Sequence, residues 1–138
     1  MNVVQSGFRD QVVMVTGATG NLGSAVAKAF AEAGAHVVAL DRDHDKQVAM
    51  HPELAQSDRH WLAGPVDLTS SEEVEKIVAE AAARFGRIDV LVNTVGGFRA
   101  GKRVHETAVE TWDLMMDLNA KTTFLMCRAV LPTMLERR

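Results

Sequence analysis

The sequence predicts an α/β protein with a doubly wound parallel sheet that helices cover on both faces. Apolar strand patterns alternate with helical patterns four times along the chain, which is typical of parallel sheets. The strands lack polar alternation, as strands buried on both faces do, and turns rich in glycine or polar residues follow them. We expect the strand order 3-2-1-4, with a ligand at the carboxyl ends of strands 1 and 4, where the order reverses.

Length and composition indicate one globular domain spanning residues 1–138. The formal net charge of −3 gives no electrostatic reason to expect a nucleic-acid partner. The single cysteine, Cys127, excludes an intramolecular disulfide and fits a reducing compartment. Residues 1–11 show no secretion signal, and no apolar run approaches the roughly 20 residues of a membrane span. We therefore expect a cytoplasmic protein that does not contact a membrane.

The first predicted strand, residues 12–16, runs into a glycine-rich turn that reads Thr16-Gly17-Ala18-Thr19-Gly20-Asn21-Leu22-Gly23. Its glycines allow backbone angles that a side chain forbids, and they let a ligand approach the main chain. A helical pattern begins at Leu22, so free N–H groups and the positive end of the helix dipole face the space above the turn. A pyrophosphate is the natural occupant of such a turn.

The second predicted strand, residues 36–41, ends in the carboxylate of Asp41. Asp41 lies 18 residues after Gly23, close to where the Rossmann-type dinucleotide fold places the acid that binds a ribose. The alternative is a solvated aspartate at a strand end. The polar stretch 42–56 is expected to form a short irregular helix interrupted by Pro52, with His44 and His51 in solvent.

Two more strand–helix units complete the pattern. A third strand in residues 60–68 leads to a helix with a capping box at Ser70–Glu73, and Gly86 ends that helix. A fourth strand, residues 88–93, is followed by a second predicted capping box at Thr107–Glu110. The long helix after it is expected to kink or end near Pro132. The glycine-rich turn, Asp41, Asp67 and the turn after Asn93 should meet at one sheet edge.

These residues resemble the short-chain dehydrogenase/reductase family along essentially the whole chain. The glycine-rich turn is similar to the family's cofactor fingerprint Thr-Gly-x-x-x-Gly-x-Gly, with Asn21 at the usual middle glycine and a glycine one place earlier. Asparagine tolerates a positive φ better than most residues, so we expect the turn to survive. The resemblance implies that the pyrophosphate is held by Gly17, Thr19, Gly20, Asn21, Leu22 and Gly23.

The resemblance also implies roles for residues after the later strands. Asp41 matches the acid that holds the adenosine ribose and favours NAD over NADP, whereas Arg42 argues mildly for NADP because a guanidinium meets a phosphate. Asp67 and Leu68 resemble the pair at the adenine. The segment Asn93-Thr94-Val95-Gly96 resembles the family's Asn-Asn-Ala-Gly and implies cofactor contacts for Asn93, Val95 and Gly96.

Asn119 is the one residue of the chain that matches a catalytic residue of the family. It follows Trp112 and Leu118 as in the family's Trp-x-x-x-x-x-Val-Asn segment. The alternative is a polar residue inside a helix that bonds a backbone carbonyl. Members of the family transfer a hydride between nicotinamide and a carbonyl or alcohol carbon, with a Tyr, a Lys and a Ser that follow this helix. The sequence contains no tyrosine, so the chain alone is expected to be catalytically incomplete.

Several functions remain open on this basis. The favoured one is the NAD(P)-binding part of a short-chain oxidoreductase that lacks the later strands, either truncated or completed by another chain. A non-catalytic dinucleotide-binding or sensing module is the alternative, and a nucleotide-sugar or methyl-transfer enzyme is weaker. The five histidines share no metal-ligand spacing, so no metal is expected. The bare fourth strand and the apolar long helix predict a homo-oligomer or association with a separate carboxyl-terminal half.

Overall fold

The computed structural model of the chain describes residues 7–137. Residues 1–6 therefore lie outside the described residues, and with them the first part of the polar lead-in predicted for residues 1–10. Of the helices in this range, none has the length and hydropathy needed to cross a membrane.

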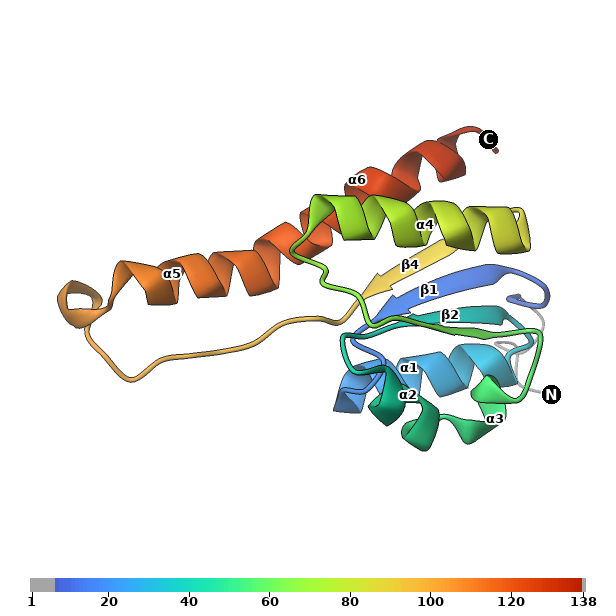
Figure 1. Cartoon of the computed structure of the whole chain (residues 1–138), viewed down its shortest axis with the longest axis horizontal. Helices are drawn as coiled ribbons and strands as arrows, with labels where there is room; N and C mark the ends of the chain where they lie inside the picture. Colours follow the sequence, from blue (N-terminus) through green and yellow to red (C-terminus); the bar gives the residue numbers. More distant parts are fainter. Residues whose placement is uncertain (1–6, 138) are drawn as a thin grey trace.

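Four parallel strands form the single sheet of the described chain, in the order β3-β2-β1-β4 (Figure 1). This is the predicted order 3-2-1-4, with the reversal between β1 and β4. Thr16, the last residue of β1, pairs with Leu40 on one side and with Asn93 on the other, so the segments that follow these strands leave the same edge. The strands are β1 (Val12–Thr16), β2 (His36–Leu40), β3 (Trp61–Ala63) and β4 (Val90–Asn93).

Helices cover both faces of the sheet, as a doubly wound arrangement requires (Figure 1). On one face lie α1 (Asn21–Glu32), α2 (His44–Met50) and α3 (Pro52–Ala55). On the other lie α4 (Ser71–Phe85) and α6 (Thr122–Leu135). The predicted irregular helix in residues 42–56 is thus two short helices, because Pro52 fits the first turn of a new helix but cannot continue the old one.

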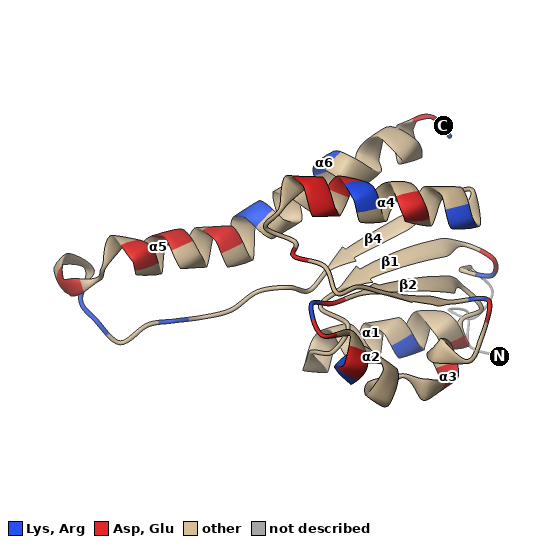
Figure 2. Cartoon of the chain, in the orientation of Figure 1, with Lys and Arg blue, Asp and Glu red and all other residues tan. Residues whose placement is uncertain are grey.

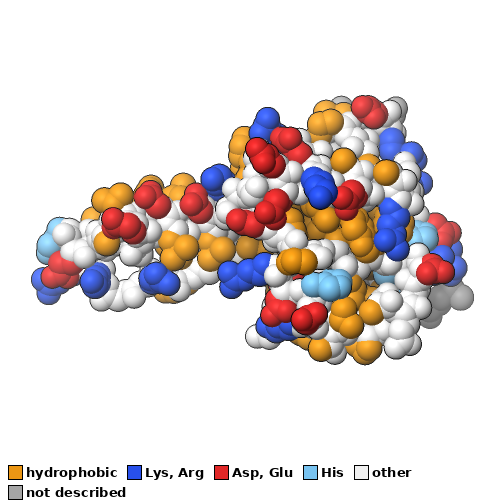
Figure 3. Space-filling model, viewed as in Figure 1, with side chains coloured by type: hydrophobic (Ala, Val, Ile, Leu, Met, Phe, Trp, Pro, Cys, Tyr) orange, Lys and Arg blue, Asp and Glu red, His pale blue; other side chains and the backbone are white. Residues whose placement is uncertain are grey.

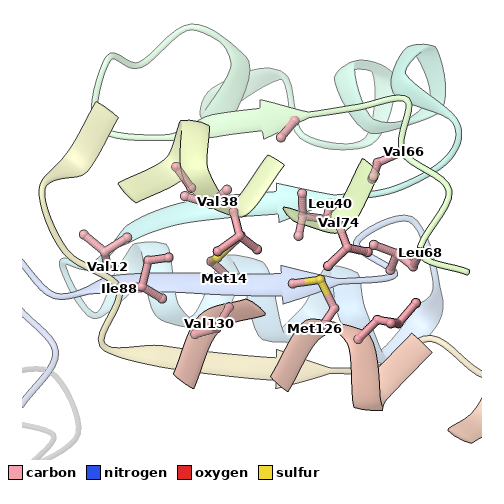
Figure 4. Packing of buried hydrophobic residues seen from close by; sticks show 14 residues of the cluster. Val12, Met14, Val38, Leu40, Val66, Leu68, Val74, Ile88, Met126 and Val130 are labelled. Carbon is pink, nitrogen blue, oxygen red and sulfur yellow. The ribbon is translucent and has the colours of Figure 1, made fainter. Parts of the chain in front are cut away.

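Two apolar cores result, because successive side chains of a strand point to opposite faces. Val13 and Val15 of β1 pack toward α1, together with Val37 and Ala39 of β2. The intervening residues pack toward α4 and α6, where Met14 meets Met126 and Val130 of α6 (Figure 4). All five residues of β1 are buried, as its uninterrupted apolar run predicts.

The cap of α4 differs in one detail from the predicted capping box. Ser70 caps the helix and its Oγ accepts from the N–H of Glu73 at 3.3 Å. The Glu73 carboxylate accepts from the N–H of Asp67 at 2.7 Å and not from Ser70. The reason is that the N–H of Ser70 already donates to the carbonyl of Asp67 at 3.1 Å. Gly86 ends α4 in the left-handed conformation, with φ 75°, as predicted.

The capping box predicted at Thr107–Glu110 is wrong. Helix α5 (Val109–Met116) begins after Ala108, and its first turn receives no side-chain cap. The Thr107 hydroxyl instead donates to the carbonyl of Arg103 at 2.9 Å, closing the short 3₁₀ turn η2 (Val104–Glu106). Because the N-cap of α5 is Ala108, Thr107 lies one residue before the cap position, where its side chain caps no N–H of the first turn.

The predicted long helix is interrupted near its middle by a π-helical segment, and Pro132 does not interrupt it. Helix α5 passes through a π-helical segment, η3 (Asp117–Lys121), into α6. Pro132 lies inside α6, which continues to Leu135, so this proline does not end the helix. A widened turn of this kind is frequent at functional sites.

One segment projects from the sheet and its covering helices (Figure 1). We call residues 96–121 the arm and the other described residues the body. Every residue from 96 to 110 is exposed, including Phe98 and Val104 at 91% and 93%. Apolar side chains run along the arm in Figure 3, and Figure 2 shows acidic residues along α5 and basic residues in the loop before it. The arm therefore presents apolar surface that the body does not cover.

Candidate functional site

The glycine-rich turn is folded tightly against the ends of β1 and β2. Gly17 has a φ of 68°, and its N–H donates to the carbonyl of Leu40 at 2.9 Å. A Cβ on Gly23 would collide with the carbonyl oxygen of Gly17 and lie 2.7 Å from Thr94 Oγ1. Glycine at position 23 therefore lets the start of α1 pack directly on the turn.

The first turn of α1 presents its N–H groups at this edge. Gly20 is the N-cap, and the first helical bond runs from the N–H of Ser24 to the carbonyl of Gly20 at 2.9 Å. The N–H groups of Asn21, Leu22 and Gly23 precede that bond, so they are available to an anion. Asn21 is the first helical residue and not a positive-φ position, so replacing the usual glycine requires no special backbone angle.

Asp41 is hydrogen-bonded directly to the turn. Its Oδ2 accepts from the N–H of Thr19 at 3.0 Å and from the Thr19 hydroxyl at 2.9 Å. Its Oδ1 accepts from the N–H of Asp43 at 3.1 Å. A Cβ on Gly64 would collide with the carbonyl oxygen of Asp41, so Gly64 lets the loop after β3 approach this residue closely. The carboxylate is thus fixed at the turn and is half-buried, with lone pairs left for further donors.

Of the predicted pair, Asp67 is exposed to solvent and Leu68 is buried in the core. The carboxylate of Asp67 is exposed, and hydrogen bonds from the hydroxyl and N–H of Thr69 hold its pKa below the usual range, with a smaller contribution from Lys121. Leu68 is 7% exposed and packs in the core beneath α4. At these two positions, therefore, only Asp67 offers its side chain to a ligand.

The segment after β4 is joined to the glycine-rich turn through Thr94. Its Oγ1 donates to the carbonyl of Thr16 at 2.6 Å, and its N–H donates to Thr16 Oγ1 at 3.2 Å. The side chain of Asn93 reaches toward α6, where its Nδ2 lies 3.8 Å from Cys127 Sγ. Val95 is half-buried, and Gly96 is exposed next to Asn119. Thr94 thus locks the two neighbouring strand ends together.

Asn119 lies in the π-helical segment, and its side chain forms three hydrogen bonds with other residues of the arm. Its Oδ1 accepts from the N–H of Gly97 at 3.0 Å. Its Nδ2 donates to the carbonyls of Gly97 and Met115, each at 2.9 Å. The bond to Met115 is the contact expected if Asn119 is only a polar residue inside a helix that bonds a backbone carbonyl. The two bonds to Gly97, by contrast, join this helical stretch to the loop after β4. Asn119 is thereby held next to the sheet edge that carries the turn.

An open depression of about 560 Å³ lies beside Asp41 and is lined by Arg42, Asp43, His44, Asp45 and Pro65. Arg42 is exposed, so its guanidinium is accessible to a ligand. Two carboxylates line the depression next to this single guanidinium. In residues 7–137, no group of three or more His, Cys, Asp or Glu side chains is placed to hold a metal ion.

Sequence reasoning missed two residues of this site. No role was predicted for Thr94, although the pairing of Thr16 with its neighbour Asn93 brings the polar groups of Thr94 and Thr16 together. His51 was expected in solvent and that expectation is wrong: it is completely buried, with Nε2 2.9 Å from the carbonyl oxygen of Ala18. Pro52 starts α3 at this point, and the only sequence signal was this break between two short helices.

Comparisons with known proteins agree with the fold. The family model of short chain dehydrogenases matches residues 11–138. An NADP-dependent 3-hydroxy acid dehydrogenase of Salmonella typhi is 37% identical over 126 residues, which are 91% of this chain and 50% of that protein. An oxidoreductase of Staphylococcus aureus is also 37% identical, over 93% of this chain and 54% of its own length. The chain thus spans about half the length of the curated relatives it matches.

A solved structure of another protein has a similar fold. A metagenomic short-chain oxidoreductase in complex with NADP superposes with a TM-score of 0.86 at 32% identity, over 96% of this chain and 60% of that one. The likeness therefore extends over the whole sheet and its helices. With the glycine-rich turn, Asp41 and Asn119 at one sheet edge, these matches show that the chain belongs to the short-chain dehydrogenase/reductase family.

Proposed function

We propose that residues 1–138 form the cofactor-binding part of a short-chain oxidoreductase, which transfers a hydride between a nicotinamide dinucleotide and a carbonyl or alcohol. The observation that carries this is the joining of the turn to Asp41, because it sets anion-binding N–H groups and a ribose-binding carboxylate at a fixed separation. The N–H groups of the first turn of α1 would hold the pyrophosphate, and Asp67 would face the adenine. The cofactor itself supplies the hydride chemistry.

We propose NAD as the preferred cofactor. A 2′-phosphate would lie near the carboxylate of Asp41, and Asp43 and Asp45 line the adjoining depression. Three carboxylates repel that phosphate, whereas Arg42 alone attracts it. Among the relatives, one is described as NADP-dependent and one solved structure holds NADP, so the expected preference depends on the charges of this chain.

Calorimetric titration of the purified chain with NAD⁺ and NADP⁺ tests the preference. We expect tighter binding of NAD⁺. Asp41→Ala should weaken NAD⁺ binding by about 1.5–3 kcal/mol for each charged hydrogen bond that is lost, and less where water replaces it. Arg42→Ala is the matched control at the neighbouring position, and it should leave NAD⁺ affinity within about twofold. Equal affinity for both dinucleotides, or an unchanged affinity in Asp41→Ala, would contradict the proposal.

A second candidate is a dinucleotide-binding module without catalysis, because Asp41 and the glycine-rich turn are joined within this chain alone. A phenolic proton donor contributes about 10²–10⁴ to a rate, and the 138 residues contain none. We expect no dehydrogenase turnover from this chain alone. Rapid oxidation or reduction of any alcohol or ketone by the pure chain would refute this. Turnover restored by a separate polypeptide carrying the later strands would favour the oxidoreductase over the binding module.

We also propose that the chain associates through the arm or β4, either with a second copy or with a separate carboxyl-terminal half, in the cytoplasm. Strand β4 pairs on one side only with β1, and its residues are half-buried. Exposed backbone groups of an edge strand invite another chain, and Trp112 of the arm is 64% exposed. Light scattering at micromolar concentration should give a mass above that of one chain. A monomeric mass with the α/β spectrum retained would contradict self-association.

A further inference from the structure

His51 is a buried imidazole that contacts the glycine-rich turn from the side of α2 and α3. It occupies the junction between these helices and has no exposed surface. Its Nε2 lies 2.9 Å from the carbonyl oxygen of Ala18. A carbonyl oxygen can only accept a hydrogen bond, so Nε2 carries the proton and donates it. Within residues 7–137, Nδ1 has no hydrogen-bond partner.

The bond from His51 fixes one side of a single peptide group. In a trans peptide, the C=O of one residue and the N–H of the next point in opposite directions. The carbonyl of Ala18 points to His51, and the N–H of Thr19 on the same peptide points to Asp41 Oδ2 at 3.0 Å. The Ala18–Thr19 peptide is thus held between a buried imidazole and the carboxylate proposed to bind the ribose.

In residues 7–137, the carbonyl of Ala18 accepts no hydrogen bond other than the one from His51. Ala18 is completely buried, so water cannot readily take the place of the imidazole. The N–H of Ala18 donates to the carbonyl of Leu40 at 3.3 Å and so restrains the opposite side of the residue. Without His51, the carbonyl of Ala18 would be buried and unpaired, and the peptide would be driven to rotate toward a new partner. That rotation would withdraw the Thr19 N–H from Asp41.

We propose that His51 is a positioning residue for the dinucleotide: by fixing the Ala18–Thr19 peptide, it orients the Asp41 carboxylate for the ribose hydroxyls. The inference rests on the proposed function, since Asp41 meets a ribose only if the chain binds a dinucleotide. His51 is buried and touches no ligand, so its effect reaches the cofactor through the peptide and Asp41.

Two substitutions separate positioning from simple packing. His51→Leu fills a similar volume without a donor, whereas His51→Gln keeps an N–H near the place of Nε2. At a temperature where both variants are folded, His51→Leu should weaken NAD⁺ binding about tenfold in calorimetry, and His51→Gln should recover most of that affinity. Hydrogen exchange of the Thr19 amide should be faster in His51→Leu and restored in His51→Gln.

Val78→Ala is the control, because Val78 lies on the buried face of α4 in the opposite core, so that truncating it lowers stability without touching the turn. If His51→Leu lowers Tm as Val78→Ala does but leaves NAD⁺ affinity and Thr19 exchange unchanged, His51 only packs and the proposal is wrong. If the unaltered chain binds no dinucleotide, the proposed function fails. The exchange of the Thr19 amide then still decides whether His51 orders this peptide, and unchanged exchange overturns the inference.

Discussion

The body and the arm follow one another along a continuous helical stretch, but their side chains are covered very differently. Met126 of α6 is completely buried between the sheet and α4, whereas Met116 of α5 is 45% exposed. The helix therefore passes from a packed core to open surface through the π-helical segment at Asp117–Lys121. The difference shows that the described chain buries the core between its sheet, α4 and α6, and does not cover the arm.

The same division separates the two halves of the candidate site. Hydrogen bonds inside the body fix the turn, Asp41 and Thr94 to one another. All three hydrogen bonds of the Asn119 side chain go to arm residues, namely Gly97 and Met115. The subsites proposed for the ribose and the pyrophosphate thus lie in the body, whereas the residue that resembles the family's catalytic asparagine depends on the order of the arm.

The largest expected difference is between two identical substitutions in this helical stretch. Met126→Ala should lower the free energy of unfolding by about 2–5 kcal/mol, because it removes a fully buried side chain and leaves a cavity. Met116→Ala should change it by no more than about 0.5 kcal/mol, as exposed substitutions do. Urea denaturation of both variants measures the comparison. A loss in Met116→Ala as large as that in Met126→Ala would show that the arm is packed after all.

A second pair compares glycines of the two regions. Gly23→Ala in the body places a Cβ against the backbone of Gly17, which cannot move without opening the turn, so a loss of about 1–3 kcal/mol is expected. Gly97→Ala in the arm places its Cβ 2.5 Å from Leu118 Cδ2, the far end of a flexible side chain. Thermal unfolding should therefore show a clear decrease in Tm for Gly23→Ala and little change for Gly97→Ala. The reverse order would contradict the account.

The smallest expected effect concerns acid pH and a histidine of the body. Burial lowers the pKa of His60, and the positive charges of Arg59 and His36 add to this. The neutral ring accepts the N–H of Val37 at Nδ1, 3.1 Å away. Below about pH 6.5 His60 binds a proton in the unfolded chain but not yet in the folded chain, so the free energy of unfolding falls as the pH falls. In His60→Asn, denaturation at pH 7 and at pH 5.5 should differ less than in the unaltered chain, and an equal difference would contradict this assignment.

A carboxylate adds to this loss at lower pH. Burial acts to raise the pKa of Asp89, but hydrogen bonds from Arg87 and from the N–H of Val12 outweigh it and leave the pKa below its usual value. The stability that Asp89 contributes is therefore present above pH 4 and is lost as the pH falls further. The two steps are distinguishable because His60→Asn removes only the first.

The fold could be predicted almost completely from the sequence. The apolar runs of β1 and β2 and the helical patterns between them are local signals, and the crossover rule then orders the strands. The placement of Asp41 at the turn followed from its spacing to Gly23. These features depend on periodicity and chain order, and both can be read directly from the residues.

The details that the sequence did not reveal depend on one contact between distant residues and on the exact start of one helix. His51 is buried because α2 and α3 turn its side chain toward Ala18, 33 residues earlier in the chain. The predicted cap at Thr107 failed because α5 begins one residue later than the sequence pattern suggests, after Ala108, and Thr107 belongs instead to the turn that precedes the helix. Neither a long-range contact nor a shift of one residue in a helix start can be read from hydrophobic periodicity.

Hydrogen exchange of the whole chain with and without NAD⁺ tests the division between body and arm most directly. The account predicts that NAD⁺ slows exchange at the amides of residues 17–23 and at the segment after Asp41. At a concentration low enough to keep the chain monomeric, residues 96–116 of the arm should exchange rapidly in both states, because no other part of the described chain covers them. Strong protection of the arm in the chain alone, with no change at the turn on adding NAD⁺, would contradict the account.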